Sequence, residues 1–149
     1  MGAPGFLELL TQARLTGDYE AVLQAIPYAR FLGLKLQSGE AGLLSVMPFS
    51  HQLIGNPMLP AIHGGVTGAF LENAAIITLI AEMDTLALPK TINITIEYLR
   101  PGRPVDTFAA GLVTRQGRRV ANVRVEAWQE DRAHPIALAS AHFLLRTPD

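Results

Sequence analysis

The feature that most constrains this chain is a long apolar segment from Gly64 to Ala81. Its only polar side chains are those of Thr67, Glu72, Asn73 and Thr78. A helix of this composition is apolar on nearly every face, so most of its sides must be covered. The length is at the lower limit for a membrane span, and a carboxylate near the centre argues against one. The segment therefore predicts a buried core helix.

Strand patterns surround this helix. Residues 91–100 alternate, with Ile92, Ile94 and Ile96 on one face and Thr91 on the other. Further strands are predicted at 105–114, 119–129 and 136–146, and a hairpin from the apolar runs 31–36 and 42–48. Only a sheet is large enough to cover the helix. We therefore expect an α+β fold in which five or six antiparallel strands wrap one long central helix.

The rest of the chain predicts a helical extension and one irregular loop. Residues 5–26 show helical spacing broken at Gly17, with Asp18 as a candidate N-cap of a second short helix. Residues 49–62 are expected to form an irregular loop that leads into the central helix. At 149 residues with 49% hydrophobic composition, the chain is long enough for one core. We expect a single domain over 1–149, with 1–27 as an N-terminal helical extension.

Composition narrows the function. The chain has no cysteine, which excludes a disulfide framework, a thiolate metal site and a cysteine nucleophile. A net charge of −1 supplies no basic field for nucleic acid or an anionic membrane. The first residues lack the basic and apolar regions of a signal peptide, so we expect a cytoplasmic protein. Arginines concentrated in the second half, including Arg100, Arg115, Arg118 and Arg119, indicate a local anion site.

Glu72 is the anomaly of the apolar segment. Burying a carboxylate costs several kcal/mol unless it is paired or hydrogen-bonded. No Lys or Arg lies within two helical turns to neutralise it. A channel to solvent or a pair with a distant arginine is the structural alternative. Otherwise the carboxylate indicates function.

His63-Gly64-Gly65 opens the helix, and Glu72 follows His63 by nine residues. This run resembles the HGG-to-acid motif of the PaaI-like acyl-CoA thioesterases of the hotdog-fold superfamily, where an acid stands nine residues after the His. Residues 91–102 and the later hairpin 116–126 extend the resemblance to roughly residues 28–146. It implies a hotdog fold and hydrolysis of a CoA thioester to free acid and CoA. No cofactor or metal is implied, because CoA is part of the substrate.

The resemblance also assigns roles. The Gly65 N–H at the helix start polarises the thioester carbonyl, and Glu72 acts as general base or nucleophile. Thr91 matches a position that holds the water or the acyl group. The water-orienting residue is left open among four candidates: His51, Gln52, Asn56 and His63. Expected substrate-binding residues are Gly64, Asn73, Arg100, Arg115, Gly117, Arg118 and Arg119.

Each assignment has a structural alternative. His63 could simply cap the helix, and the two glycines could form only a tight turn. Asn73 could be a dimer contact, and Thr91 only a good strand former. The arginine-rich turn could be solvated, although its charges suit the phosphates of CoA.

Spacing adds an oligomeric expectation. Seven residues separate Gly65 from Glu72, which is about 10 Å along one helix at ~1.5 Å per residue. One carbonyl cannot touch both groups, so the carboxylate must come from a second subunit whose helix runs antiparallel. A two-fold homodimer with two identical sites satisfies this requirement. The family usually forms tetramers, which implies a dimer of dimers.

Two rival functions stay open. A hotdog hydroxyacyl-thioester dehydratase would need a histidine where Asn56 stands. A non-catalytic acyl-CoA-binding hotdog module would not need Glu72. The acyl group is not fixed, although Leu53, Ile54, Met58 and Leu59 could line an apolar pocket for medium-chain or aromatic groups.

Overall fold

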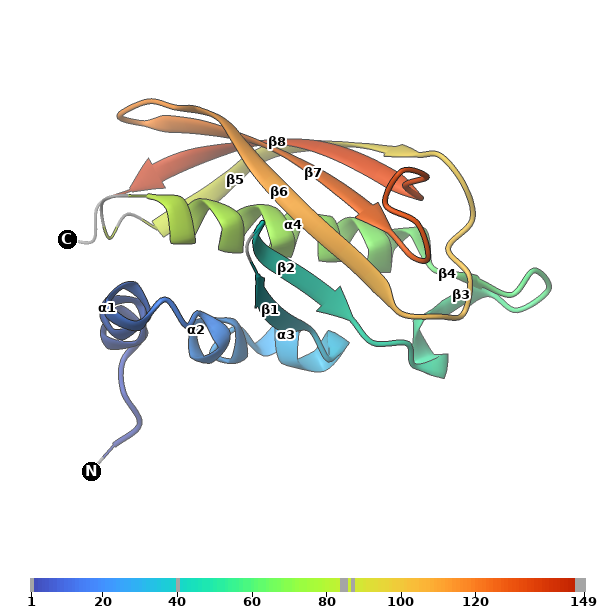
Figure 1. The fold of residues 1–149 in the computed structure, drawn as a ribbon, viewed down its shortest axis with the longest axis horizontal. Coiled ribbons are helices and arrows are strands. Elements are labelled where there is room, and N and C mark those ends of the chain that lie inside the picture. Colours follow the sequence, from blue (N-terminus) through green and yellow to red (C-terminus); the bar gives the residue numbers. More distant parts are fainter. Residues whose placement is uncertain (1, 40, 84–85, 87, 147–149) are drawn as a thin grey trace.

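A computed structural model describes residues 2–39, 41–83, 86 and 88–146. A six-stranded antiparallel sheet, in the order β1-β2-β6-β7-β8-β5, wraps one long helix, α4 (Gly64–Glu82) (Figure 1). The strands are β1 (Lys35–Gly39), β2 (Gly42–Met47), β5 (Leu88–Tyr98), β6 (Thr107–Gln116), β7 (Val120–Trp128) and β8 (Ala137–Arg146). The expected fold is confirmed.

Three helices, rather than the expected two, precede the sheet: α1 (Phe6–Thr16), α2 (Glu20–Gln24) and α3 (Pro27–Leu32). The Asp18 carboxylate accepts the Glu20 N–H at 3.0 Å, although Tyr19 is the N-cap residue. The strand expected from residue 31 was wrong at its start, because Pro27 favours a first helical turn and Gly33, at φ 72°, ends the helix.

The N-terminal helices lie on the side of α4 away from strands β5 to β8, next to β1 (Figure 1). Leu10 and Leu23 are almost fully buried in the same hydrophobic core as α4. Helix α2 also covers the start of the outer edge of β1. The Glu20 carboxylate accepts the Leu36 N–H at 2.9 Å, and the Gln24 amide donates to the Leu34 carbonyl at 3.1 Å.

The segment before α4 is more ordered than the expected loop. It forms a short 3-10 helix, η1 (His51–Leu53), and a hairpin of β3 (Ile54–Asn56) and β4 (Ala61–Ile62). The His63 N–H donates to the Leu53 carbonyl at 2.8 Å. A Cβ on Gly55 would lie 2.7 Å from the His63 Cα, so only glycine lets this hairpin pass beneath His63.

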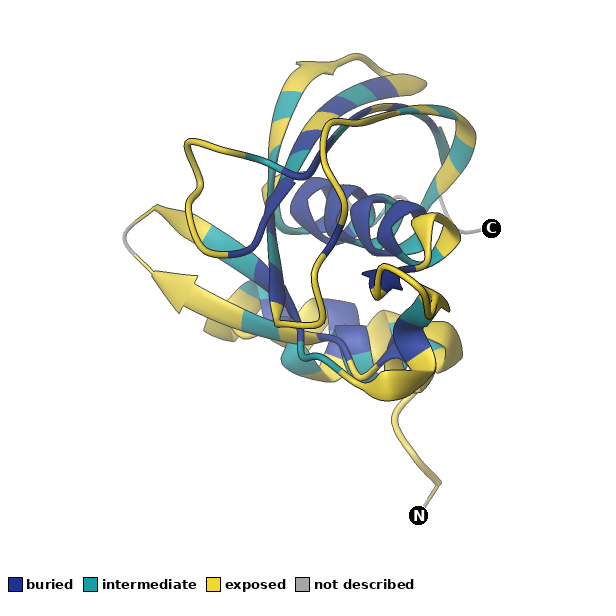
Figure 2. Ribbon diagram, turned by 90° about the vertical axis from the view of Figure 1, so that its right-hand side faces the viewer, coloured by how far each residue is buried: buried dark blue, intermediate teal, exposed yellow. Residues whose placement is uncertain are grey.

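Most faces of α4 are buried, as Figure 2 shows in a view along the helix. β6 approaches closely because Gly111 has no side chain; a Cβ there would lie 2.6 Å from the Thr78 hydroxyl. α4 is long and apolar enough to span a membrane, but here it is the wrapped core helix. One stripe is only partly covered within the described chain: Val66, Ala69, Glu72, Asn73 and Ile76. Glu72, expected to be buried, is therefore only half-buried in a single chain.

Strand β5 contains a bulge that decides which way Thr91 faces. Thr91 pairs with Phe143, and Asn93 pairs with the adjacent His142. Ile92 therefore has no partner on β8 and is the extra residue of the bulge. Simple alternation puts Thr91 on the outer face. The bulge turns it toward α4 instead. β5 is also an edge strand, because among the described residues it pairs only with β8.

Candidate active site

The start of α4 is held by its own histidine. His63 is the N-cap residue, and its Nδ1 accepts the Gly65 N–H at 2.8 Å. His63 therefore caps the helix, as the structural alternative proposed. The Gly65 N–H, which was expected to bind the thioester, donates to His63 instead. Because Nδ1 is an acceptor here, a neutral His63 carries its proton on Nε2. Among the hydrogen bonds of the described residues, none uses the Gly64 N–H.

Tyr98 lies against this helix start. Its hydroxyl donates to the Gly64 carbonyl at 2.7 Å, and a Cβ on Gly64 would lie 3.5 Å from the phenol ring. A pocket of about 370 Å³ opens beside these residues, lined also by Ile62, Thr67 and Arg100. A helix N-terminus with an unused N–H beside a pocket is suited to hold a developing oxyanion.

Glu72 pairs with Thr91 across the gap between α4 and β5. The Thr91 hydroxyl donates to Glu72 Oε1 at 2.8 Å, and both residues are half-buried. Within the described chain, Glu72 forms no ion pair, so the alternative of a distant arginine partner is not seen. No described residue uses its second oxygen either. The carboxylate is oriented at one oxygen and open at the other.

The two halves of the site lie at opposite ends of β5. α4 runs unbroken from Gly64 to Glu82, so Glu72 stands about 10 Å from Gly65 at ~1.5 Å per residue. The helix start contacts Tyr98, the last residue of β5, whereas Glu72 contacts Thr91 near its beginning. A single chain therefore does not bring the carboxylate to the helix start.

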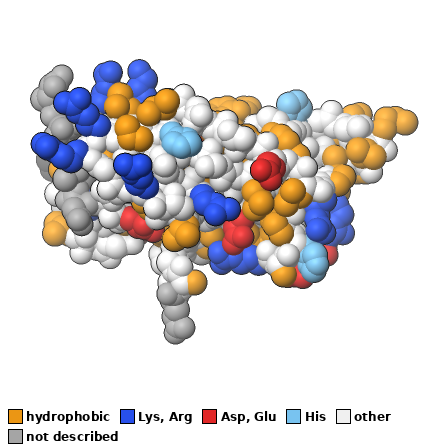
Figure 3. Space-filling model, turned by 90° about the horizontal axis from the view of Figure 1, so that it is seen from above, with side chains coloured by type: hydrophobic (Ala, Val, Ile, Leu, Met, Phe, Trp, Pro, Cys, Tyr) orange, Lys and Arg blue, Asp and Glu red, His pale blue; other side chains and the backbone are white. Residues whose placement is uncertain are grey.

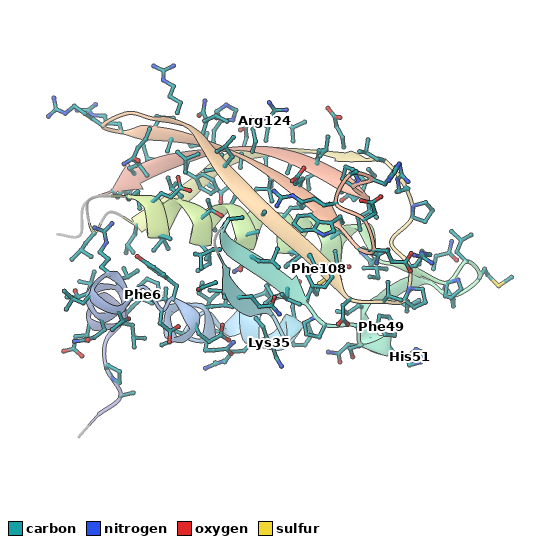
Figure 4. The ribbon with its side chains drawn as sticks, viewed as in Figure 1. Phe6, Lys35, Phe49, His51, Phe108 and Arg124 are labelled. Atoms are coloured by element: carbon teal, nitrogen blue, oxygen red, sulfur yellow. The ribbon has the colours of Figure 1, made fainter. Side chains whose placement is uncertain are left out.

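The other candidate residues are spread more widely. Asn56 is exposed, and its side-chain oxygen accepts the Met58 N–H at 3.0 Å. His51 and Gln52 are exposed on η1, where the His51 ring packs edge-on against Phe49 at 5.6 Å between centroids (Figure 4). Asn73 lies beside Glu72 on the partly covered stripe of α4.

The basic residues divide into two places. Arg100 lines the pocket at the helix start. Arg115, Arg118 and Arg119 are exposed around the β6–β7 turn, where the Gly117 N–H donates to the Val120 carbonyl at 2.9 Å. This turn lies at the opposite end of the molecule from the helix start (Figure 1), and Lys and Arg side chains gather at one end of the outer sheet face (Figure 3).

The loop residues suggested for an acyl pocket do not form one in a single chain. Leu53 is buried in the core, whereas Met58 is 91% exposed and Leu59 63% exposed at the tip of the β3–β4 hairpin. In the described residues, no cluster of three or more His, Asp or Glu side chains is arranged to hold a metal ion.

Sequence reasoning missed two contributors to this site. The sequence patterns give no role to Tyr98, which lies in the predicted strand 91–100, or to Gly55, which lies in the expected loop 49–62. The one signal in the sequence was a tyrosine near the end of an alternating strand. Its partner Gly64 lies 34 residues earlier, so the sequence does not reveal that the two residues are in contact.

The thioesterase superfamily sequence model matches residues 59–136, from the β3–β4 hairpin through α4, β5, β6 and β7 to the residue before β8. The chain belongs to the thioesterase superfamily. This confirms the expected hotdog thioesterase family and the expected class of enzyme, a hydrolase of thioester bonds.

Known proteins resemble the chain over most of its length. The medium/long-chain acyl-CoA thioesterase YigI of Salmonella typhimurium is 30% identical, over 85% of this chain and 90% of YigI. A solved protein of Chromobacterium violaceum is 39% identical with a TM-score of 0.76, over 95% of this chain and 99% of that one. A Bacillus halodurans protein solved with CoA is 19% identical with a TM-score of 0.76, over 97% and 93%, and shows the fold alone.

Proposed function

We propose that the protein is an acyl-CoA thioesterase that hydrolyses a CoA thioester to a carboxylic acid and CoA. Its similarity to YigI, a medium/long-chain acyl-CoA thioesterase, supports this substrate class. The observation that carries the proposal is the Thr91–Glu72 hydrogen bond of 2.8 Å on the same helix that begins with an unused N–H at Gly64. These are the parts that a hydrolase needs to activate water and to hold an oxyanion.

The proposed site is shared between two chains. In one chain, the partly covered stripe of α4 and the free edge of β5 lie open, and Ile92 on that edge is 57% exposed. An open edge strand is a template for pairing with another strand. Pairing of β5 with the same strand of a second copy covers the edge and brings the two α4 helices together.

The bulge in β5 supports a particular register for this pairing. When Ile92 is left out of the count, Thr91 lies three ladder positions before Thr95 and Tyr98 lies three after it. Antiparallel pairing centred on Thr95 therefore sets Thr91 of one chain opposite Tyr98 of the other, on the same face. Glu72 of one chain then meets the helix start of its partner.

The carbonyl oxygen of the substrate is proposed to bind at this helix start. The Gly64 N–H is unused, and His63 offers Nε2–H because its Nδ1 accepts from Gly65. The resemblance gives the Gly65 N–H to the thioester; in this geometry Gly65 acts through His63 instead. The positive end of the α4 dipole adds to the stabilisation of the oxyanion.

Glu72 is proposed as the general base. Its Oε1 accepts from Thr91, which leaves Oε2 to take a proton from water. The water oxygen bonds to the carbonyl carbon as the C=O π electrons move to oxygen. Collapse of this oxyanion breaks the C–S bond, and the thiolate takes the proton from Glu72. The alternative is direct attack by Glu72, which forms an anhydride that water then hydrolyses.

CoA is proposed to lie across the two chains. In the antiparallel dimer, the β6–β7 turn of one chain lies toward the helix-start end of the other. Arg115, Arg118 and Arg119, with Gly117 in the turn, then face the phosphates, and Arg100 lies beside the pocket. The apolar lining from Ile62, Leu99 and Ile136 suits an acyl chain of medium length.

The dimer is proposed to pair further into a dimer of dimers. The outer sheet face has a hollow of about 510 Å³, lined in part by Arg124 and Glu126, and Arg124 projects from this face (Figure 4). Mixed charges of this kind can pair across a two-fold axis. A mass measurement in solution checks the assembly.

We also expect a cytoplasmic protein that needs no resident cofactor.

The function is tested with a panel of short-, medium- and long-chain and aryl-acetyl CoA esters, with thiol release as the readout. We expect hydrolysis by the wild type and a loss of at least about a hundredfold in kcat for Glu72→Gln. Glu82→Gln is the matched control, because Glu82 is exposed at the end of the same helix. A wild type that releases no thiol from any ester contradicts the proposal.

The same panel separates the rivals. A binding module would retain acyl-CoA without releasing thiol, and binding measured by calorimetry would reveal it. A dehydratase would hydrate enoyl-CoA, although the described loop places Asn56, not a histidine, at the exposed end of β3.

A further inference from the structure

We infer that Tyr98 is a positioning residue that holds His63 in the tautomer that donates from Nε2. It acts through the peptide bond between Gly64 and Gly65. This inference rests on the proposed function for its effect on turnover, but its structural part is testable without substrate.

The connection is a continuous series of hydrogen bonds. The Tyr98 hydroxyl donates to the Gly64 carbonyl at 2.7 Å, and the N–H of the same peptide unit, that of Gly65, donates to His63 Nδ1 at 2.8 Å. The peptide unit is planar, so its C=O and N–H turn together. Hydrogen bonds in series also polarise one another, so donation by Tyr98 makes the Gly65 N–H a stronger donor.

Tyr98 itself is anchored from two sides. Its backbone ends β5 opposite Ala137, and its ring packs where Gly64 and Gly68 leave the surface of α4 bare. A Cβ on Gly68 would lie 3.4 Å from the hydroxyl. The phenol therefore approaches the peptide from a fixed direction.

The hydroxyl is a clean target for removal. Within one chain Tyr98 is 56% exposed and its hydroxyl forms its hydrogen bond at the surface, so we expect removal of the hydroxyl to cost the fold little. Tyr98→Phe keeps the ring against the glycines and deletes only the donor. Tyr28→Phe is the matched control, because Tyr28 is 55% exposed and lies on α3 in a stack with Phe31.

The first experiment measures the hydrogen-bond series directly in the full-length protein, without substrate. Amide and imidazole ¹⁵N spectra report the Gly65 N–H and the protonated nitrogen of His63. We expect Tyr98→Phe to move the Gly65 resonance and to lower the fraction of His63 protonated on Nε2, whereas Tyr28→Phe changes neither.

The second experiment measures turnover. We expect Tyr98→Phe to lower kcat about tenfold, with KM and Tm unchanged, since one neutral hydrogen bond is lost. An unchanged His63 tautomer overturns the inference, whatever happens to kcat. So does a raised KM with normal kcat, which would mean direct contact with substrate. If the wild type releases no thiol from any ester, the proposed function fails instead, and the spectra still decide the role of Tyr98.

Discussion

Mixing two inactive variants tests whether the active site is built from two chains. Glu72→Gln removes the proposed base, and Gly64→Pro removes the unused N–H at the start of α4. Proline suits this position, because residue 64 is the first of the helix and His63 has ψ 130°, which a residue before proline prefers. A Cβ at residue 64 meets the Tyr98 ring at 3.5 Å, an ordinary contact. Both variants should therefore fold.

The expected activity follows from the separation of the two groups. Each site of a two-fold dimer takes its helix start from one chain and its Glu72 from the other, and each variant alone should lose about a hundredfold or more in kcat. Random exchange of equal amounts makes half of the dimers mixed. Each mixed dimer has one site with both groups intact, so the mixture should recover about a quarter of wild-type activity.

The assay is thiol release per chain after the two variants are unfolded together and refolded. Native mass spectrometry of a tagged and an untagged chain verifies that mixed dimers form. Gly64→Ala is the control, because it keeps the N–H and should stay active. Mixed dimers with no more activity than the parent variants would refute the shared site.

Three further predictions concern single residues. Thr91→Val removes the hydroxyl that donates to the Glu72 carboxylate and should lower kcat about tenfold, and Thr91→Ser should restore it; equal kcat in the wild type and both variants would contradict the role. Gly55→Ala should cost about 1–3 kcal/mol in denaturant unfolding, because its Cβ would lie 2.7 Å from the backbone of His63, whereas Gly5→Ala, with open space around it, should cost little. The Ala133 N–H, and then His134, lower the pKa of Asp131 from its ordinary 3.8. The stability that these two contacts contribute is therefore present above pH 3.8 and is lost as the pH falls through the lowered pKa. A carboxyl NMR titration of Asp131 with a midpoint at or above 3.8 would contradict this.

The long periodic segments of the fold were predictable from the sequence. α4 and strands β5 to β8 have enough residues for their hydrophobic period to be read, and their bounds differ from the predictions by a few residues. The short elements were not. α3 depends on Pro27 and Gly33 at its ends rather than on periodicity, and the β3–β4 hairpin depends on the fit of Gly55 beneath His63.

The candidate site was predictable only where a sequence motif carried it. His63, Gly64, Gly65 and Glu72 lie within one motif, so their spacing could be read directly. The orientation of Thr91 could not, because the bulge at Ile92 reverses the face that alternation assigns. Pairing of the Gly65 N–H with His63 was open as a capping alternative, but the sequence alone does not choose between the two acceptors.

The two edges of the sheet differ in a way that limits growth. At β1, side chains of α2 occupy the Leu36 N–H and the Leu34 carbonyl, whereas β5 has no such cover in the described chain. If both edge strands of the sheet were free to pair with other chains, further copies could add at each edge and form a fibre. Because α2 covers the start of the β1 edge, the proposed pairing of β5 with β5 would end at a dimer. α2 therefore protects the start of the β1 edge as well as contributing to the core.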